Sequence, residues 1–491
     1  MLKAILRLTK QSLIYGMGQV LSKAVIIILL PVHTNKLLPE EYGAFNLLLL
    51  FIGFMAIIYS FGLNTAFLQF YILEPDRRKK DQYFATAFLA TLVLAIGLSL
   101  ITYSFRAQLS VWLFQDQRYQ DIMAIVVGIL SLDAFILLAK NILRAEEKSV
   151  IYGVVSLLNV AINCGLNIQF VVKYGMGLKG ILFANLLASG ITFMMLLPLT
   201  IRHMLVPASQ ELLKKMLKFG LPFLPSALAI FLIDSVDRKF IEKYLGMAAV
   251  GIYGAGYKIS LVIKLFINAF NVAWVPFFLS LANEQNAKQI FAKVMTYFTV
   301  LCSLIFLFFA MFMQTIVRFR LFGYTIVGKE YWASLQIVPV VILAYIFFGF
   351  YLNFQPGAFL TGKTKYFAHI NVIGAGVNIL ANMILIPWFG LMGAAYATLI
   401  AYFVMAISLY LITQRIYPIE YEQIKLIKIG LITGLIVLLD HWVKVPFQLI
   451  FQFLLLGLFL VLIYVFKIFD AREIRSLKGL INKFYGKISF R

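Results

Sequence analysis

Residues 35–45 read NKLLPEEYGAF, and residues 243–253 read KYLGMAAVGIY. Both stretches run from a polar segment through a turn to a glycine that opens an apolar run. A second pair follows in the same order: Asn163-x-x-x-Asn167 precedes GLKG at 177–180, and Asn378-x-x-x-Asn382 precedes GLMG at 390–393. The members of both pairs lie near 208 to 215 residues apart, so we interpret them as an internal repeat.

The composition is that of a membrane protein. Of the 491 residues, 62% are hydrophobic and only 13% are charged, whereas soluble domains are about half apolar and about one quarter charged. A helix needs roughly 20 apolar residues to cross a bilayer. The chain therefore has room for about a dozen or more crossings, and no large soluble domain fits beside them.

Apolar runs between charged or turn-rich breaks predict fourteen membrane spans. The thirteenth is the weakest, because it ends early at Asp440 and His441. The predicted spans cover residues 11–32, 43–71, 83–105, 121–139, 150–172, 180–201, 218–237, 248–281, 294–317, 333–360, 367–387, 391–413, 427–441 and 447–466.

The repeat places span 5 on span 11 and span 6 on span 12, so each copy contains six spans. Because six is even, both copies have the same orientation and are related by an axis along the membrane normal. The predicted fold is an all-α polytopic membrane protein with two six-helix bundles and two extra C-terminal helices. Its predicted parts are a bundle at 1–202, a cytoplasmic linker at 203–216, a second bundle at 217–414, and two further spans with a basic tail at 415–491.

The net charge of +22 follows the predicted topology. Most Lys and Arg residues fall in the segments on the side of the N-terminus, led by Arg77-Arg78-Lys79-Lys80 and the tail after Lys467. The positive-inside rule therefore places both termini in the cytoplasm and argues against nucleic acid as a partner. We interpret the N-terminal apolar run as a retained first span, since no A-x-A-like cleavage site follows it. The absence of Asn-x-Ser/Thr sequons agrees with a bacterial inner membrane.

The sequence offers little for catalysis. GAFLTGKT at 357–364 satisfies the Walker A pattern, but membrane spans precede and follow it, so we expect no nucleotide site. No H-E-x-x-H, no G-x-S-x-G and no metal-binding cluster of cysteines and histidines occurs, and we expect no cofactor and no metal. Cys164 and Cys302 lie in apolar segments and are interpreted as packing residues.

Polar side chains inside spans carry the information about function, because charge in the hydrocarbon zone is expensive and faces protein or water. Lys23 and Lys264 both lie near the predicted midplane, one in each copy of the repeat. Each belongs to a polar stripe, and Lys258 lies nearer the outside. The stripes are Tyr15, Gln19, Ser22 and Lys23 in the first span, and Tyr257, Lys264, Asn268 and Asn271 in the eighth. The pattern predicts a cationic cavity between two bundles; the alternative is that each lysine snorkels or pairs privately with a carboxylate.

Other intramembrane polar groups have two interpretations each. The asparagine stripes Asn159, Asn163, Asn167 and Asn371, Asn378, Asn382 are explained equally by hydrogen bonds between helices and by substrate contact. Asp133 is a candidate for ion or proton coupling, or else the partner of a lysine. Asp234 and Asp237 are further coupling candidates, although Asp234 and Arg238 are four residues apart, which favours an intrahelical ion pair. His33 and His369 are expected to be local hydrogen-bond partners.

Several stretches resemble bacterial polysaccharide-biosynthesis flippases of the multidrug, oligosaccharidyl-lipid and polysaccharide exporter superfamily. The resemblance covers the first twelve spans and extends to the two C-terminal helices. It is carried by Leu30-Pro31 with LLPEEYG at 37–43, DSVDRKFI at 234–241, VGIY at 250–253 running into YKIS at 257–260, and AWVPF at 273–277.

The resemblance implies two six-helix bundles that rock around a central cavity and flip an undecaprenyl-pyrophosphate-linked oligosaccharide for cell-surface polysaccharide assembly. Lys23, Lys258 and Lys264 would attract the pyrophosphate as point charges, since no arginine lies within a predicted span where the family often has several. The coupling ion would be a proton or sodium, and the partners would be membrane lipids and other polysaccharide-assembly membrane proteins. The alternatives are a drug/cation antiporter of the same superfamily, a membrane glycosyltransferase or polymerase, and a silent scaffold for the assembly machinery.

Overall fold

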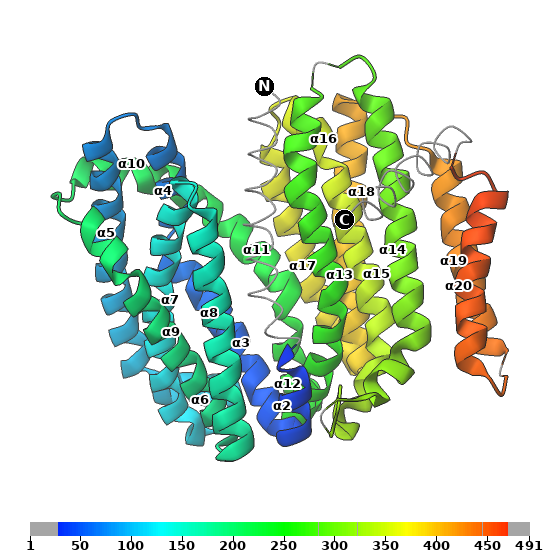
Figure 1. Cartoon of the computed structure of the whole chain (residues 1–491), viewed down its shortest axis with the longest axis horizontal. Coiled ribbons are helices and arrows are strands. Elements are labelled where there is room, and N and C mark those ends of the chain that lie inside the picture. The colour runs from blue at the N-terminus through cyan, green and yellow to red at the C-terminus, as the bar shows by residue number, and fades with distance from the viewer. Residues whose placement is uncertain (1–27, 283, 322, 444, 470–491) are drawn as a thin grey trace, which may run out of the picture. The chain divides into compact units, whose positions relative to one another are not determined.

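The computed structural model describes residues 28–282, 284–321, 323–443 and 445–469, which are almost wholly helical (Figure 1). The helices of the first half are α2 (Leu30–Lys36), α3 (Pro39–Ser60), α4 (Leu63–Leu73), α5 (Arg77–Ser104), α6 (Arg106–Phe114), α7 (Gln120–Ala145), α8 (Ser149–Asn167), α9 (Gly177–His203) and α10 (Gln210–Gly220), with the short turns η1 (Gln117–Tyr119) and η2 (Ile168–Lys173).

The second half continues with helices and one small hairpin. The helices are α11 (Leu224–Ser235), α12 (Asp237–Leu245), α13 (Met247–Ser280), α14 (Ala287–Arg318), α15 (Val338–Asn353), α16 (Gln355–Leu360), α17 (Lys365–Phe389), α18 (Leu391–Ile416), α19 (Gln423–Trp442) and α20 (Gln448–Val465), with the 3-10 turns η3 (Leu221–Phe223) and η4 (Lys329–Ile337). Strands β1 (Arg320–Leu321) and β2 (Tyr324–Thr325) pair antiparallel, with Arg320 opposite Thr325.

The predicted all-α polytopic membrane fold is confirmed. Within the described ranges, twelve helices are long and apolar enough to cross a membrane, and each coincides with a predicted span. The predicted first span, 11–32, lies almost entirely outside the described residues. The weak thirteenth span corresponds to α19, a helix of 20 residues that is not among the twelve.

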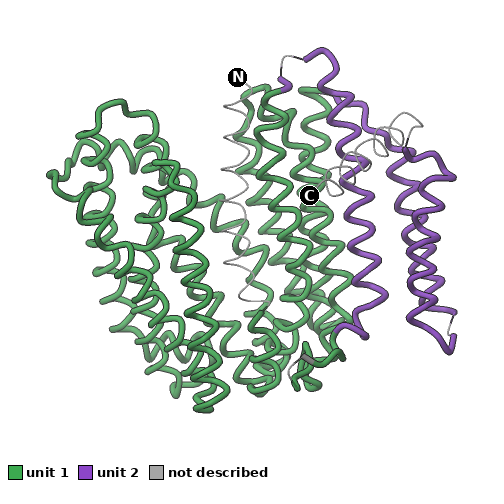
Figure 2. The backbone as a smooth tube through the Cα atoms, viewed as in Figure 1, with its two compact units in different colours: residues 1–280, 317–417 green, residues 281–316, 418–491 purple. Residues whose placement is uncertain are grey.

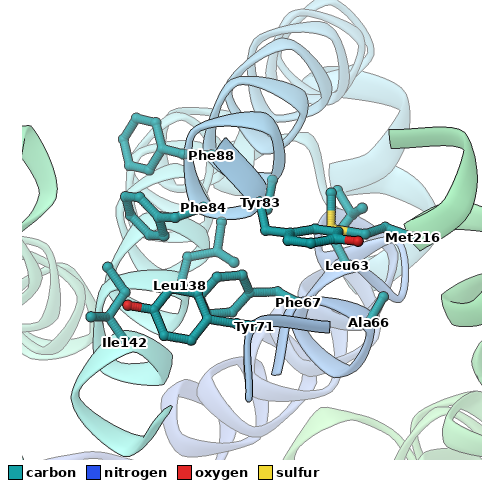
Figure 3. Packing of buried hydrophobic residues seen from close by; sticks show 11 residues of the cluster. Leu63, Ala66, Phe67, Tyr71, Tyr83, Phe84, Phe88, Leu138, Ile142 and Met216 are labelled. Carbon is teal, nitrogen blue, oxygen red and sulfur yellow. The ribbon is translucent and has the colours of Figure 1, made fainter. Parts of the chain in front are cut away.

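The predicted span at 43–71 is broken into two helices. α3 ends at Ser60, and both Phe61 (φ 46°) and Gly62 (φ 74°) adopt left-handed backbone before α4 begins. Gly62 also packs against the backbone of Gly220, where a side chain at either position would collide with the other. The break directs α4 against α5, α7 and α10, where Phe67, Phe84 and other apolar side chains form a buried cluster (Figure 3).

The chain divides into two compact units (Figure 2). Residues 1–280 and 317–417 form unit 1, and residues 281–316 and 418–491 form unit 2. The core of unit 2 joins α14, α19 and α20 through side chains such as Leu307, Ile436 and Phe459. α14 was expected in the second six-helix bundle, and the division at 202, 216 and 414 stays a prediction.

The two copies of the repeated motif touch each other inside unit 1. A Cβ on Gly43 of α3 would strike the carbonyl oxygen of Met247, and a Cβ on Gly251 of α13 would strike that of Pro39. Met247 and Gly251 are the repeat counterparts of Pro39 and Gly43, so the contact is reciprocal. Reciprocity is what a two-fold relation between the copies produces, and it supports the predicted pseudo-two-fold axis.

Helix α2 also joins the two halves of unit 1. The Nδ2 of Asn35 donates to the carbonyl of Thr325 at 2.7 Å, and the hydroxyl of Tyr331 donates to the carbonyl of Leu37 at 2.9 Å. The backbone N–H of Gly328 donates to Thr34 Oγ1 at 3.0 Å. These three bonds attach α2 and the residue after it to the segment from Thr325 to Tyr331, at the end of unit 1 that contains the hairpin.

Candidate functional site

The predicted site residues fall into three groups in the structure. Tyr15, Gln19, Ser22 and Lys23 lie outside the described residues. Asp234, Asp237, Tyr257, Lys258, Lys264, Asn268 and Asn271 lie on α11 to α13, whereas Asp133 lies on α7. The structure therefore places the candidates for ion coupling in different parts of unit 1.

Asp234 is the acceptor at the centre of the aspartate–tyrosine cluster, formed by Asp234, Tyr257, Lys264, Tyr345 and Tyr402. The ammonium of Lys264 pairs with one carboxylate oxygen of Asp234. The other oxygen accepts hydrogen bonds from the hydroxyls of Tyr402 at 2.7 Å, Tyr345 at 3.2 Å and Tyr257 at 3.3 Å. The cluster joins α11, α13, α15 and α18, and the charge of Lys264 is balanced within it.

The expected ion pair between the side chains of Asp234 and Arg238 is wrong. Arg238 Nη1 donates to the backbone carbonyl of Asp234 at 2.5 Å and to Asp237 Oδ1 at 2.8 Å. The other oxygen of Asp237 accepts from the Tyr253 hydroxyl at 2.6 Å. The spacing of four residues pointed to Arg238, but α11 ends at Ser235 and Arg238 lies on α12, while Lys264 of α13 reaches Asp234 instead.

Lys258 faces away from this cluster and toward α3. Its ammonium donates to the hydroxyl of Tyr42 at 2.9 Å and lies 4.3 Å from the centre of the Tyr42 ring and 4.8 Å from that of Phe45. The side chain is 5% exposed. Among the described residues, no carboxylate lies within ion-pairing distance of Lys258, so aromatic rings and one hydroxyl are its surroundings there.

Asn268 and Asn271 continue along α13, both half-buried. In the described part of the chain, the Oδ1 of Asn271 is buried without a hydrogen-bond partner. A buried amide oxygen with spare acceptor capacity is the kind of group that a polar ligand satisfies, so the predicted binding role of Asn271 stays open.

The asparagine stripes make hydrogen bonds between and within helices. From α8, Asn159 donates to Thr192 of α9 at 2.8 Å, and Asn163 donates to Asn185 at 2.6 Å. Asn167 donates to both oxygens of Asn163, at 2.9 Å to its carbonyl and 2.8 Å to its Oδ1. The interpretation as hydrogen bonding is confirmed for this stripe.

The second stripe repeats the geometry of the first. On α17, Asn382 Nδ2 donates to the carbonyl of Asn378 at 2.9 Å and to its Oδ1 at 3.0 Å. Asn371 donates to Ser226 at 3.0 Å and accepts from Tyr351 at 3.1 Å. The matching pair of bonds at equivalent positions supports the internal repeat.

Two adjoining cavities lie beside the first stripe. One, of about 330 Å³, is lined by Asp133, Lys140, Tyr59, Asn64 and Ser189 among others. The second, of about 220 Å³, is lined by His33 and Lys258. Both are lined by Asn159, Asn163 and Asn185, and we call the combined space the asparagine cavity. The stripe therefore bonds the helices together and also lines a polar space.

Asp133 is the acid of the asparagine cavity. One of its oxygens accepts from the Ser189 hydroxyl at 2.7 Å. Lys140 lies two turns further along α7, with its ammonium 5.9 Å from the centre of the Tyr152 ring. Within the described ranges no salt bridge joins Asp133 to a lysine, but Lys140 lines the same cavity and its charge acts on the Asp133 carboxylate, so both interpretations of Asp133 stay predictions.

The two histidine predictions are confirmed. His33 Nε2 lies 3.1 Å from Asn167 Oδ1, and His369 Nδ1 lies 2.7 Å from the carbonyl of Lys365. The first four residues of the Walker-like stretch 357–364 lie in α16 itself, and the stretch stands between α15 and α17, with a helix rather than a strand directly before it. In the described part of the chain, no group of three or more His, Cys, Asp or Glu side chains could hold a metal ion.

Sequence reasoning missed several members of these sites. Tyr345 and Tyr402 stand in apolar runs, where a tyrosine looks like a packing residue, and only the fold brings them to Asp234. Lys140 directly follows the predicted span 121–139, but it lies inside α7. The one signal in the sequence for this position of Lys140 is the apolar pattern of the span 121–139, which can continue for a further helical turn past residue 139.

Comparisons with known proteins agree with this fold. A protein encoded in the Lsg locus of Haemophilus influenzae is 22% identical over 417 residues, covering 81% of this chain and 98% of the relative. An uncharacterized membrane protein of the same organism is 24% identical over 431 residues, covering 84% and 99%. This chain spans nearly the whole length of both relatives.

Solved transporters share the architecture. The lipid II flippase MurJ in an inward closed conformation superposes with a TM-score of 0.72 at 15% identity, covering 93% of this chain and 99% of that one. An inward-facing multidrug resistance MATE transporter of the MOP superfamily gives 0.66 at 16% identity, covering 80% and 94%. Residues 8–282 match the family described as polysaccharide biosynthesis protein. Because this match covers more than half of the chain, and twelve described helices are long and apolar enough to cross a membrane, the protein is a multi-pass membrane member of the polysaccharide biosynthesis protein family.

Proposed function

We propose that the protein is a non-enzymatic flippase that moves an undecaprenyl-pyrophosphate-linked oligosaccharide from the cytoplasmic to the outer leaflet. It would work by alternating access in the bacterial inner membrane, with both termini in the cytoplasm. Family membership and the MOP fold support a transporter for polysaccharide assembly. One relative is named as a membrane protein, one structural neighbour as a multidrug resistance transporter, and MurJ as a lipid II flippase.

The asparagine cavity is the observation that carries the proposal. Amide and hydroxyl groups from Asn159, Asn163, Asn185 and Ser189 line a space inside an otherwise apolar bundle. Amides both donate and accept hydrogen bonds, which matches the alternating donors and acceptors of sugar hydroxyls. A polar cavity in a membrane fold is costly unless a polar ligand or water fills it, and a saccharide headgroup is a ligand of that chemistry.

The pyrophosphate would be attracted by lysines. Lys258 lines the asparagine cavity and has no carboxylate within ion-pairing distance among the described residues, so an anion in the cavity would be the partner of its protonated side chain. Lys264, with Tyr257, Asn268 and Asn271 on the same helix, and Lys23, with Gln19 and Tyr15, would contribute as predicted. Because Lys264 already balances Asp234, its contribution requires that the anion share the ammonium with that carboxylate.

A proton or sodium ion would couple transport to an ion gradient. Asp133 is our first candidate, because its carboxylate lines the asparagine cavity and accepts only one described side-chain hydrogen bond. Asp234 and Asp237 are weaker candidates, since both are occupied by several donors. Asp133 also favours the second candidate function, a cation antiporter, because a carboxylate in a cavity attracts soluble cations.

The test is a flipping assay with purified protein in liposomes. Lipid-linked saccharides from the source cells are incorporated, and the rate at which headgroups reach an external glycan-modifying probe is measured. We expect acceleration by the native protein and its loss in the Lys23→Gln/Lys264→Gln variant. The Asp234→Asn/Lys264→Gln variant should lose flipping as well, because it also lacks Lys264, although it leaves no unpaired carboxylate at position 234.

Three results would redirect the assignment. No acceleration with or without ion gradients, together with exchange of soluble cations that depends on Asp133, would favour the antiporter. New glycosidic bonds made by purified protein would indicate a glycosyltransferase or polymerase. Transport that is insensitive to every cavity substitution would indicate a scaffold for other polysaccharide-assembly proteins.

A further inference from the structure

A groove between α4 and α7 adjoins the asparagine cavity. Its volume is about 480 Å³, and we call it the α4–α7 groove. Asn64 and Leu137 line both the groove and the cavity, so the two spaces share a wall. α7 ends at Ala145, and the groove lies toward this end of the helix, which the predicted topology places at the cytoplasmic surface. A molecule in the groove therefore lies next to the cavity on its cytoplasmic side.

Arg144 supplies the positive charge of the α4–α7 groove. Its Nη1 donates to Asn141 Oδ1 at 3.4 Å, and Asn141 Nδ2 donates to Asn64 Oδ1 at 3.3 Å. Asn141 is buried, so this series of contacts links the exposed side chain of Arg144 on α7 to α4. A guanidinium has five N–H donors, and the contact with Asn141 is the one described side-chain bond of Arg144. Its other donors are available to a ligand in the groove.

Three neighbouring basic side chains at this end of the bundle, Arg77, Lys148 and His203, contact carboxylates. Arg77 and Lys148 contact the two oxygens of Glu146 at 2.9 and 2.7 Å, and His203 contacts Asp81 at 2.6 Å. Among the described residues, no carboxylate lies within ion-pairing distance of Arg144. Glu146 and Asp81 thus contact Arg77, Lys148 and His203 rather than Arg144, and the guanidinium that lines the groove can pair with an anionic ligand at this position.

The rim of the α4–α7 groove is apolar. Ile72 is 58% exposed and Leu73 is 67% exposed at the end of α4, and Leu137 of α7 is also exposed. The opposite face of α7 packs Leu138 and Ile142 into the buried cluster of Figure 3, so the wall that carries Leu137 and Arg144 is firmly held. A guanidinium beside exposed aliphatic side chains matches a phosphate that is attached to a hydrocarbon chain.

We propose that the α4–α7 groove is a loading site for the phosphate end of a polyprenyl phosphate lipid, held by Arg144 and flanked by the apolar rim. The proposal rests on the proposed function as a flippase and adds where the substrate binds before it enters the asparagine cavity. Arg144 binds two phosphate oxygens with parallel N–H donors, which a lysine cannot reproduce. The headgroup then passes along the shared wall at Asn64 and Leu137.

The test measures lipid binding to the full-length protein in nanodiscs. The probes are undecaprenyl pyrophosphate, undecaprenol, which lacks the phosphates, and inorganic pyrophosphate, which lacks the chain. The variants are Arg144→Gln, Arg144→Lys and, as control, Arg202→Gln, which removes an exposed charge near the end of α9. We expect Arg144→Gln to weaken binding of undecaprenyl pyrophosphate about tenfold or more. Arg144→Lys should be intermediate, and Arg202→Gln should have no effect.

The result that overturns the loading site is equal affinity for undecaprenyl pyrophosphate in the native, Arg144→Gln and Arg202→Gln proteins. Inorganic pyrophosphate binding as tightly as the lipid would also overturn it, because the apolar rim would then contribute nothing. If Arg144→Gln does not yield folded protein, the comparison of Arg144→Lys with the native protein decides the question, with equal affinity overturning the proposal.

The flipping assay separates this proposal from the function on which it rests. Native flipping together with unchanged lipid binding by Arg144→Gln would refute the loading site and leave the flippase assignment standing. Arg144-dependent lipid binding without any flipping by the native protein would refute the flippase assignment and retain the groove as a phosphate-lipid site.

Discussion

Removing one member of the pair between Asp234 and Lys264 should destabilise the protein more than removing both charges together. The two side chains are 16% and 19% exposed, and they join α11 to α13 within the aspartate–tyrosine cluster. Breaking a buried ion pair by removing one partner costs about 3 to 5 kcal/mol, because the other charge is left uncompensated.

The neighbours of each charge decide which single substitution lowers the free energy of unfolding more. In Lys264→Gln, the carboxylate keeps three tyrosine hydroxyls at 2.7, 3.2 and 3.3 Å, which places the loss at the lower end, about 3 kcal/mol. In Asp234→Asn, the main remaining neighbour of the Lys264 ammonium is the Tyr345 ring, whose centre lies 5.1 Å from it. The expected loss in the free energy of unfolding is therefore about 4 kcal/mol. The double variant leaves two neutral amides that can bond each other, with an expected loss of about 2 kcal/mol.

The assay is unfolding of the purified protein in mixed detergent micelles, with all four proteins in one double-mutant cycle. The expected coupling energy is about 5 kcal/mol, the amount by which the two single losses together exceed the loss in the double variant. Additive losses, with the double variant as unstable as both singles combined, would refute the reasoning that the two charges depend on each other.

Three further outcomes follow from other contacts. Gly251→Leu should increase the labelling of cysteines by a reagent added from the outer side. A leucine side chain has no room against the carbonyl of Pro39, so it forces α3 away from α13. Unchanged labelling would contradict the close packing of these two helices. Tyr42→Phe should cost about 1 to 3 kcal/mol in unfolding experiments, since the 2.9 Å hydrogen bond from Lys258 is lost while a ring remains; no loss would show that the rings alone hold the ammonium. Burial raises the pKa of Glu146, but the hydrogen bond and charge of Lys148, with His203 and Tyr71, hold the pKa below its ordinary value of 4.5. A depressed pKa stabilises the folded state above about pH 4.5, and this stabilisation is lost as the pH falls further. Below about pH 4.5 the melting temperature should therefore drop more steeply in the native protein than in Glu146→Gln. Parallel pH profiles of the two proteins would contradict this.

The fold was largely predictable because membrane spans are encoded by local composition. Twelve of the predicted spans overlap a described helix that is long and apolar enough to cross a membrane, since a run of apolar residues must bury its backbone polar groups in hydrogen bonds to cross the bilayer. The break at Phe61 and Gly62 was not predicted, because it depends on the backbone of Gly220, far away in the chain. The grouping of α14 with α19 and α20 depends on packing in the same way.

The candidate sites were only partly predictable, because partners across helices leave no local pattern. The stripe on α8 was visible as asparagines spaced four residues apart, and the structure gives each of them a hydrogen bond. Asp234 was visible as an acid within an apolar segment, but spacing pointed to Arg238 of the next turn rather than Lys264, 30 residues away. A lysine and an aspartate on different helices can be matched only when the helices are placed side by side.

The reciprocal contact of Gly43 with Met247 and Gly251 with Pro39 has a consequence for how such a chain can arise. A surface that meets its own repeat counterpart is self-complementary, as in a symmetric dimer of identical subunits. A chain of half the length, with one copy of the motif and an even number of spans, carries everything needed to pair with a second copy of itself in the same membrane orientation. Joining two such chains end to end preserves the contact, and each half is then free to acquire its own polar residues, as α8 and α13 have done.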